Sequence, residues 1–174
     1  MKDGTVLLWK KPVETKGFTG FVCKCITFFT KSDFVHVAVI SNGMMCESSV
    51  WKEGGKLAHG ARMIWPVKAD VYLEPIIDLT EKQSDYLDAY CIYTARKKRP
   101  YNVLKLLVLA IVYPTRWFWR LIHWVPFNRE MRGEVCSVYV DDAFMFAGID
   151  LFPRHMEGYT VPGDFINCIK LRKL

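Results

Sequence analysis

A cysteine at the start of a helical pattern is the first feature of the sequence that points to chemistry. Cys136 follows Gly133 and Glu134, and apolar residues recur at helical spacing after it, at Val140, Ala143, Phe144 and Ala147, with Gly148 marking the end. A sulfur at the first turn of a helix lies near the positive end of the helix dipole and near unpaired backbone N–H groups, which favours the thiolate. This placement predicts a nucleophile. The alternative is a buried cysteine that acts as a small hydrophobic residue.

A thiolate nucleophile needs a base within hydrogen-bond reach, and the sequence has four histidines, His36, His59, His123 and His155. His36 is the best candidate because it lies in the apolar, strand-like run from Phe34 to Ile40. A histidine in such a strand can also be a core residue with satisfied hydrogen bonds. His59, in a glycine-flanked loop, is the reserve candidate.

A predicted hairpin places an acid beside His36. Asn42-Gly43 between two strand-like runs is a strong hairpin signal, and it pairs Ser41 with Met44 and Ile40 with Met45. Continued outward, this register puts His36 and Glu47 on one face as diagonal neighbours, about 7–8 Å apart between backbones. Glu47 is therefore predicted to orient His36 and to stabilise its charged form. A loop longer by one residue would turn Glu47 to the other face.

The elements around these residues predict an α+β domain in which an antiparallel sheet packs against helices. An early helix ends near Lys31, and a later helix begins at the capping box Thr80 to Gln83 and runs towards the basic stretch Arg96 to Arg99. The strand-like runs are Thr5 to Trp9, Phe34 to Ile40, Met45 to Val50, Ala61 to Val67, Asp70 to Ile77 and Gly163 to Leu171. This order lacks the regular alternation of a doubly wound sheet.

Length and composition fit one domain over residues 1–174. Hydrophobic residues make up 51% of the chain and charged residues 24%, which excludes a disordered tail or a collagen-like fibre. No internal repeat or low-complexity linker divides the chain. The net charge of +6 favours anionic surfaces such as phospholipid or cell wall.

The cysteines predict neither disulfides nor a metal site. The chain has no signal-peptide-like start, so its six cysteines are expected to be reduced and the protein to be cytoplasmic or peripheral at a membrane, unless an outside factor exports it. Cys23 and Cys25 lack a second pair at zinc spacing, and they would point about 200° apart on a helix. We therefore expect no metal and no cofactor.

An apolar and aromatic stretch, 103–125, is predicted to be a helical insertion or lid. Its uninterrupted apolar run is too short to span a bilayer. Trp117, Trp119 and Trp124 together with Arg116 and Arg120 have the composition of an interfacial segment, so peripheral membrane contact is one interpretation, and a buried lid or a partner-binding patch is the other. No nucleic-acid motif accompanies these residues, and no nucleic-acid partner is expected.

Several short motifs resemble one known family. Phe34 to Ile40 followed by Cys46-Glu47-Ser48-Ser49 is similar to the histidine strand and the acidic strand of circularly permuted NlpC/P60-type papain-like hydrolases, the YiiX-like group. Three more stretches resemble its nucleophile helix, its last strand and its tyrosine turn, namely Val135 to Val140, Tyr159 to Phe165 and Pro100-Tyr101-Asn102. Two departures are the reversed Asp3-Gly4 order in the opening strand and Val138, where an acidic residue is common.

The resemblance implies a papain-like fold in which the histidine precedes the cysteine. It also implies a Cys-His-Glu triad, with Cys136 as nucleophile, His36 as base and then acid, and Glu47 as the orienting residue. The expected reaction is hydrolysis of a peptide or peptidoglycan amide through an acyl-enzyme. Lipid acyl hydrolysis or acyl transfer, known in lecithin retinol acyltransferase-like relatives, is the nearest alternative, and a non-catalytic binding module on the same scaffold is another.

Overall fold

A six-stranded antiparallel sheet is the centre of the fold. The computed structural model describes residues 1–10, 17–49, 60–102, 104–105, 108, 115, 135–152 and 160–174, and of residues 17–22 only the backbone. The strands lie in the order β4-β3-β2-β1-β5-β6, and each neighbouring pair is antiparallel. Their bounds are β1 Val6–Lys10, β2 Phe34–Ser41, β3 Met44–Ser49, β4 Gly60–Ile64, β5 Val71–Pro75 and β6 Leu171–Lys173.

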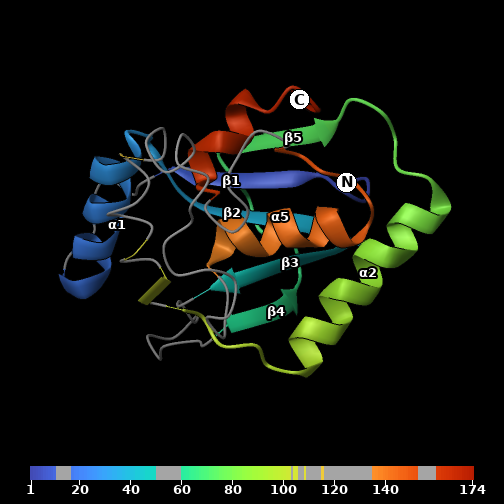
Figure 1. The fold of residues 1–174 in the computed structure, drawn as a ribbon, viewed down its shortest axis with the longest axis horizontal. Helices are drawn as coiled ribbons and strands as arrows, with labels where there is room; N and C mark the ends of the chain where they lie inside the picture. Colours follow the sequence, from blue (N-terminus) through green and yellow to red (C-terminus); the bar gives the residue numbers. More distant parts are fainter. Residues whose placement is uncertain are drawn as a thin grey trace.

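Helices cover one face of the sheet and its ends. Figure 1 shows α5 (Cys136–Phe146) across the middle strands, α2 (Glu81–Arg96) at one end and α1 (Gly17–Thr30) at the other. The main core lies between α5 and the sheet, where Tyr139 and Phe144 pack with Val37 and Val39. A smaller cluster contains the residues that alternate with these along the strands, Leu7, Ala38, Ile40 and Met45 among them. Both faces of the central strands are therefore buried, and the predicted α+β class agrees with the structure.

The hairpin that carries His36 has the predicted register. Ser41 pairs with Met44, Ile40 with Met45 and Val39 with Cys46. The φ angles of Asn42 and Gly43 are 48° and 71°, which is the left-handed backbone that a two-residue type I′ turn requires at both positions. Beyond the turn, β3 also pairs with β4, where Glu47 lies opposite Arg62.

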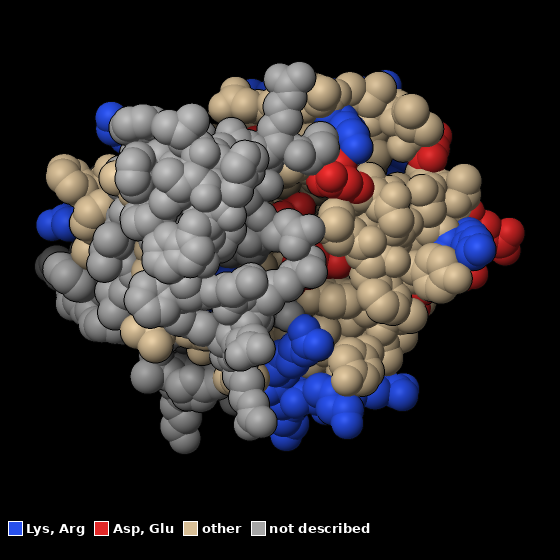
Figure 2. Space-filling view, viewed as in Figure 1, with Lys and Arg blue, Asp and Glu red and all other residues tan. Residues whose placement is uncertain are grey.

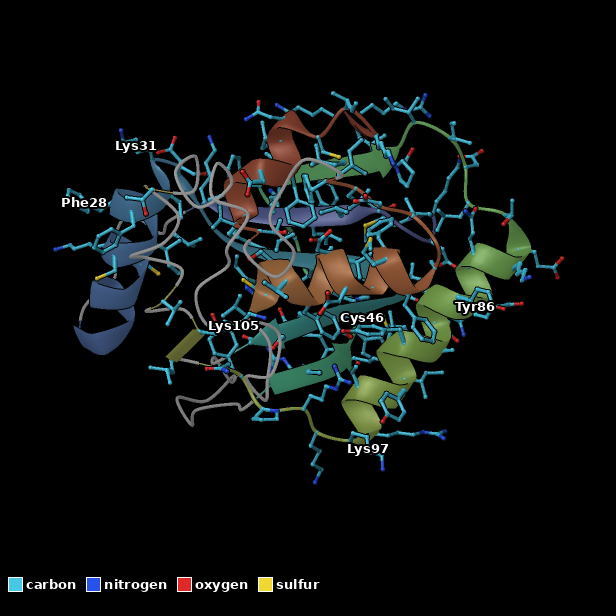
Figure 3. The ribbon with its side chains drawn as sticks, viewed as in Figure 1. Phe28, Lys31, Cys46, Tyr86, Lys97 and Lys105 are labelled. Atoms are coloured by element: carbon cyan, nitrogen blue, oxygen red, sulfur yellow. The ribbon has the colours of Figure 1, made fainter. Side chains whose placement is uncertain are left out.

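The helix α2 begins at the predicted capping box. The backbone N–H of Gln83 donates to Thr80 Oγ1 at 3.3 Å, and the Gln83 side chain accepts from the backbone N–H of Thr80 at 3.0 Å. The buried face of the helix consists of Leu87, Tyr90, Cys91 and Thr94. Tyr86 and Lys97 lie on its outer side, whereas Cys46 of β3 lies within the interior (Figure 3).

The basic stretch Arg96 to Arg99 lies at the end of α2, as predicted, with Arg96 in the last turn and Lys97 as the C-cap. Lys97 and Arg99 both lie over the ring of Tyr93, at 6.0 and 5.8 Å from its centroid. Figure 2 shows basic side chains gathered at the lower edge of this face, in the region where α2 ends.

The predicted closing strand from Gly163 to Leu171 is wrong over most of its length. Residues Pro162–Asn167 form a 3-10 helix, η2, and the strand β6 is confined to Leu171–Lys173. Proline fixes φ at the first position of the turn, and the Asp164 carboxylate accepts from the backbone N–H of Val161 at 3.0 Å. The strand predicted over Ala61 to Val67 also ends early, at Ile64, because Pro66 cannot donate to a neighbouring strand.

Candidate active site

His36 and Glu47 are in direct contact. His36 Nε2 lies 2.5 Å from Glu47 Oε2, and both side chains are largely shielded from solvent, with exposed fractions of 15% and 3%. Trp9 of β1 packs beside the imidazole, with 5.3 Å between ring centroids. The predicted neighbourhood of the histidine and the acid is therefore present, although the catalytic role of the pair stays a prediction.

Arg62 holds the other oxygen of Glu47. Its Nε and Nη2 atoms lie 2.6 and 2.5 Å from Glu47 Oε1. Nothing in the sequence pattern singled out Arg62, since its place depends on the register between β3 and β4. That register sets Arg62 directly opposite Glu47. The one local signal for Arg62 in the sequence is that an arginine lies in the strand next to the strand of Glu47.

Burial and charge act against each other at this pair. Burial disfavours the imidazolium, but the Glu47 carboxylate and the hydrogen bond and charge of Cys136 outweigh that effect and raise the pKa of His36 to about 10. Burial likewise opposes ionisation of Glu47, but His36 and then Arg62 lower its pKa to about 2. At neutral pH the pair is therefore an imidazolium and a carboxylate.

Cys136 is the first residue of α5 and meets His36 through its side chain. The interaction of the two side chains is one of the causes that raise the pKa of His36. Burial, together with the charges of Cys136 and Cys23, raises the pKa of the neighbouring Tyr101 phenol. The cysteine is 4% exposed. The structure thus brings Cys136, His36 and Glu47 together.

A buried polar network holds the start of α5. Ser137 Oγ donates to the Thr160 carbonyl at 2.5 Å, and Thr160 Oγ1 donates to Asp141 Oδ2 at 2.6 Å. These bonds tie the first two turns of the helix to the segment that precedes η2. The N-cap residue, Val135, makes no side-chain hydrogen bond to the helix. The backbone N–H groups of the first turn are therefore not satisfied by a capping side chain of that residue.

One solved structure supports the fold. The chain superposes on the metalloprotein YiiX from Escherichia coli O157:H7 with a TM-score of 0.60 and 12% sequence identity, over 99% of this chain and 96% of YiiX. The chain therefore has a YiiX-like fold. No protein-family profile and no curated protein sequence matches it. The YiiX-like resemblance of the short motifs is supported at the level of fold, and this likeness leaves the activity open.

The described residues do not form a metal site. Among them, no group of three or more His, Cys, Asp and Glu side chains is arranged to hold an ion. Glu47 already binds two cationic groups, His36 and Arg62, and their charge disfavours a metal cation at its carboxylate. YiiX is described as a metalloprotein, and that property is not transferred to this chain.

Several predictions fall outside the described residues. These are the roles of His59, His123 and His155, the membrane contact through Trp117, Trp119 and Trp124, and most of the 103–125 insertion or lid. In the described part of the chain, no helix is long and apolar enough to cross a bilayer. The six cysteines are all described, and all are free thiols.

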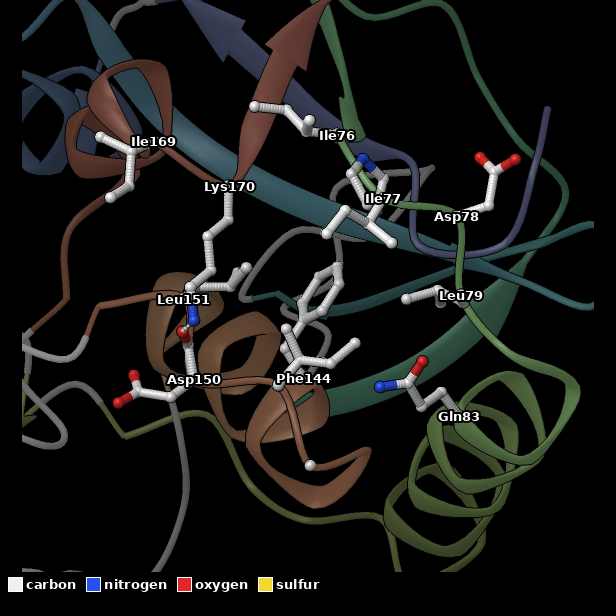
Figure 4. Close-up of a pocket in the computed structure, with 13 residues that line it drawn as sticks. Ile76, Ile77, Asp78, Leu79, Gln83, Phe144, Asp150, Leu151, Ile169 and Lys170 are labelled. Atoms are coloured by element: carbon white, nitrogen blue, oxygen red, sulfur yellow. Dashed lines mark hydrogen bonds between the residues drawn. The ribbon is translucent and has the colours of Figure 1, made fainter.

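A cavity of about 360 Å³ lies at the other end of α5 (Figure 4). Its wall is formed by the segment from Pro75 to Leu79, by Phe144 and by the residues that follow α5. Phe144 lies eight residues after Cys136, which is about 12 Å along a helix axis. The cavity is therefore separate from the Cys136 site.

Proposed function

We propose that the protein is a cysteine hydrolase that uses Cys136, His36 and Glu47 as its triad. The observation that carries the proposal is the direct contact of Glu47 with His36, whose imidazole interacts in turn with Cys136 at the start of a helix. These residue types in this order are those of a thiolate nucleophile, its proton carrier and the group that orients the carrier. The order of the histidine strand before the cysteine helix agrees with a circularly permuted papain-like domain, which is part of the same proposal.

The geometry suggests how acyl transfer would proceed. Glu47 engages Nε2 of His36, so Nδ1 is the ring nitrogen left for the sulfur. The Cys136 thiolate attacks the carbonyl carbon and forms a C–S bond, while the backbone N–H groups of the first turn of α5 stabilise the oxyanion. The imidazolium gives its proton to the leaving amine as the C–N bond breaks. Water then attacks the thioester with His36 as base, and the thiol and the acid product are released.

An amide bond in a peptide or in peptidoglycan is the leading substrate class, and it rests on the resemblance of the motifs. The same machinery suits thioesters and lipid esters, so a lipid acyl hydrolase or acyltransferase is the nearest alternative. These classes differ in the acyl donor and share the nucleophile, so one trapping experiment serves both.

The exposure of Cys136 favours a second candidate function. Cys136 is 4% exposed. A large substrate reaches such a sulfur less easily than it would reach a nucleophile in an open cleft. A non-catalytic binding module that keeps the scaffold of a hydrolase would have such a cysteine. The two candidates differ in whether Cys136 reacts in the folded protein.

The test is capture of an acyl-enzyme. The protein is mixed with peptide p-nitroanilides, peptidoglycan fragments and p-nitrophenyl acyl esters, and each cysteine-containing peptide is then weighed by mass spectrometry. We expect an acyl adduct on Cys136, together with product release that is lost in Cys136→Ala and retained in the control Cys25→Ala. Product release that is equal in the two variants, or no adduct with any donor, would contradict the proposal and favour the binding module.

A further inference from the structure

We propose that Arg62 is a positioning residue of this site, which holds Glu47 in place for His36 and offsets the carboxylate charge that the imidazolium experiences. The proposal deepens the proposed function and rests on it for its catalytic meaning. Its first test, however, measures His36 itself and needs no substrate.

The two oxygens of Glu47 have separate partners. Oε2 contacts His36, and Oε1 accepts from two nitrogens of the Arg62 guanidinium at 2.6 and 2.5 Å. A carboxylate held on one oxygen alone is free to rotate about its last side-chain bond. A planar guanidinium that donates through two nitrogens restrains that rotation. Arg62 therefore keeps Oε2 directed at the imidazole.

The backbone around Arg62 is itself anchored. The neighbouring Ala61 N–H donates to the Arg99 carbonyl at 2.9 Å, which ties the start of β4 to the end of α2. Gly60 has a φ of +112°, and a Cβ there would lie 1.6 Å from the Arg99 oxygen. Glycine is thus required for the close approach of the two segments. With β3 paired on its other side, Arg62 has a fixed place opposite Glu47.

The charges that face His36 show what Arg62 changes. Glu47 of β3 and Cys136 of α5 act on the imidazole, and Trp9 of β1 covers it with an uncharged ring. Burial and the charge of Cys136 raise the pKa of the Tyr101 phenol, so this neighbour of Cys136 is uncharged near neutral pH. Arg62 lies beyond Glu47, so its guanidinium offsets part of the negative charge that the carboxylate presents to His36. Without the guanidinium, the full negative charge would hold the imidazolium proton more strongly and make His36 a weaker acid towards a leaving group.

The experiment compares Arg62→Gln and Arg62→Lys with a matched control, Arg172→Gln. Arg172 also lies opposite a strand carboxylate, Glu74, across the β5–β6 pair, at 3.9 Å and with 56% of its side chain exposed. The imidazole of His36 is titrated by NMR and assigned from its absence in His36→Gln. We expect Arg62→Gln to raise the pKa of His36 by about 1, a tenfold change in proton affinity. Arg172→Gln and Arg62→Lys should leave it within about 0.3 of the wild-type value.

A pKa of His36 that is unchanged or lowered in a folded Arg62→Gln variant would overturn the charge role. Arg62→Lys keeps the cation and supplies the test if the glutamine variant does not fold. Because a lysine cannot donate through two nitrogens as the Arg62 guanidinium does, we expect the turnover of Arg62→Lys to fall about tenfold with KM unchanged. Wild-type turnover in this variant would overturn the positioning role. If the wild-type protein shows no turnover, the proposed function fails, whereas the titration still decides the link between Arg62 and His36.

Discussion

Removal of the Glu47 charge is the most informative single change to the site. Glu47→Gln keeps the size of the side chain and an oxygen that can accept from Arg62 or His36. In the wild-type protein, burial favours neutral His36, but Glu47 and Cys136 outweigh it and raise the pKa to about 10. Without the carboxylate, the burial effect is opposed much less. We expect the pKa of His36 to fall towards or below its ordinary value of 6.5.

The size of the effect follows from the same pKa. A group whose folded pKa is raised from 6.5 to about 10 stabilises the fold fully below pH 6.5 and loses that contribution as the pH rises through 10. At pH 7, about three pH units below the folded pKa, the contribution is at most about 4 kcal/mol. The lowered pKa of Glu47 reflects the same contact together with the contact to Arg62, so its effect is not added. That carboxylate stabilises above its ordinary pKa of 4.5 and loses the effect as the pH falls through 2.

A double-mutant cycle measures the coupling free energy between His36 and Glu47 separately from the other effects of each substitution. Urea unfolding is followed by circular dichroism for the wild type, Glu47→Gln, His36→Gln and the double variant, at pH 7 and at pH 10.5. We expect a coupling free energy of about 2–4 kcal/mol at pH 7. It should fall by more than half at pH 10.5, where His36 is mostly neutral. A coupling below about 0.5 kcal/mol at pH 7, or one that is equal at both pH values, would refute this account of the pair.

Three further predictions concern the scaffold. Cys46 and Cys91 are fully buried, and the interaction with Cys91, together with burial, raises the thiol pKa of Cys46. At pH 8 neither cysteine should react with iodoacetamide until urea unfolds the protein. Rapid labelling of either cysteine in the folded protein would contradict the packing. Gly163→Ala should destabilise the fold by about 1–3 kcal/mol in urea unfolding, since its Cβ would lie 2.4 Å from Ser32 Oγ, and an unchanged midpoint would exclude that contact. Thr80→Ala should cost about 1 kcal/mol through the lost helix cap, whereas no change would mean that the capping box seen at Gln83 contributes nothing in solution.

The features that could be predicted from the sequence are those determined by local chemistry. Asn42 and Gly43 specify a tight turn through their own backbone preferences, and the alternation of side chains then brings His36 to Glu47. The cap of α2 needs only Thr80 and Gln83. In each case the interacting groups are joined by a short piece of chain whose geometry is regular.

The features that could not be predicted depend on contacts between distant segments. Arg62 lies opposite Glu47 only because β4 pairs with β3 in one register, and the ten residues between the two strands are too long a connection for a turn type to set that register. The apolar pattern after Gly163 reads as a strand, but a proline, a side-chain hydrogen bond and the close approach to Ser32 make a 3-10 helix instead. The burial of Cys136 is likewise a property of the assembled fold.

The most direct test of the central claim is the alkylation rate of each of the six cysteines with iodoacetamide as a function of pH. Rates are read by peptide mass spectrometry in the wild type and in His36→Ala. We predict that near pH 6 Cys136 reacts faster than the other five cysteines, despite its small exposure, and that it loses this advantage without His36. A Cys136 that reacts no faster than the other five, or that is inert in both proteins, would contradict the claim that Cys136 and His36 form a working nucleophile.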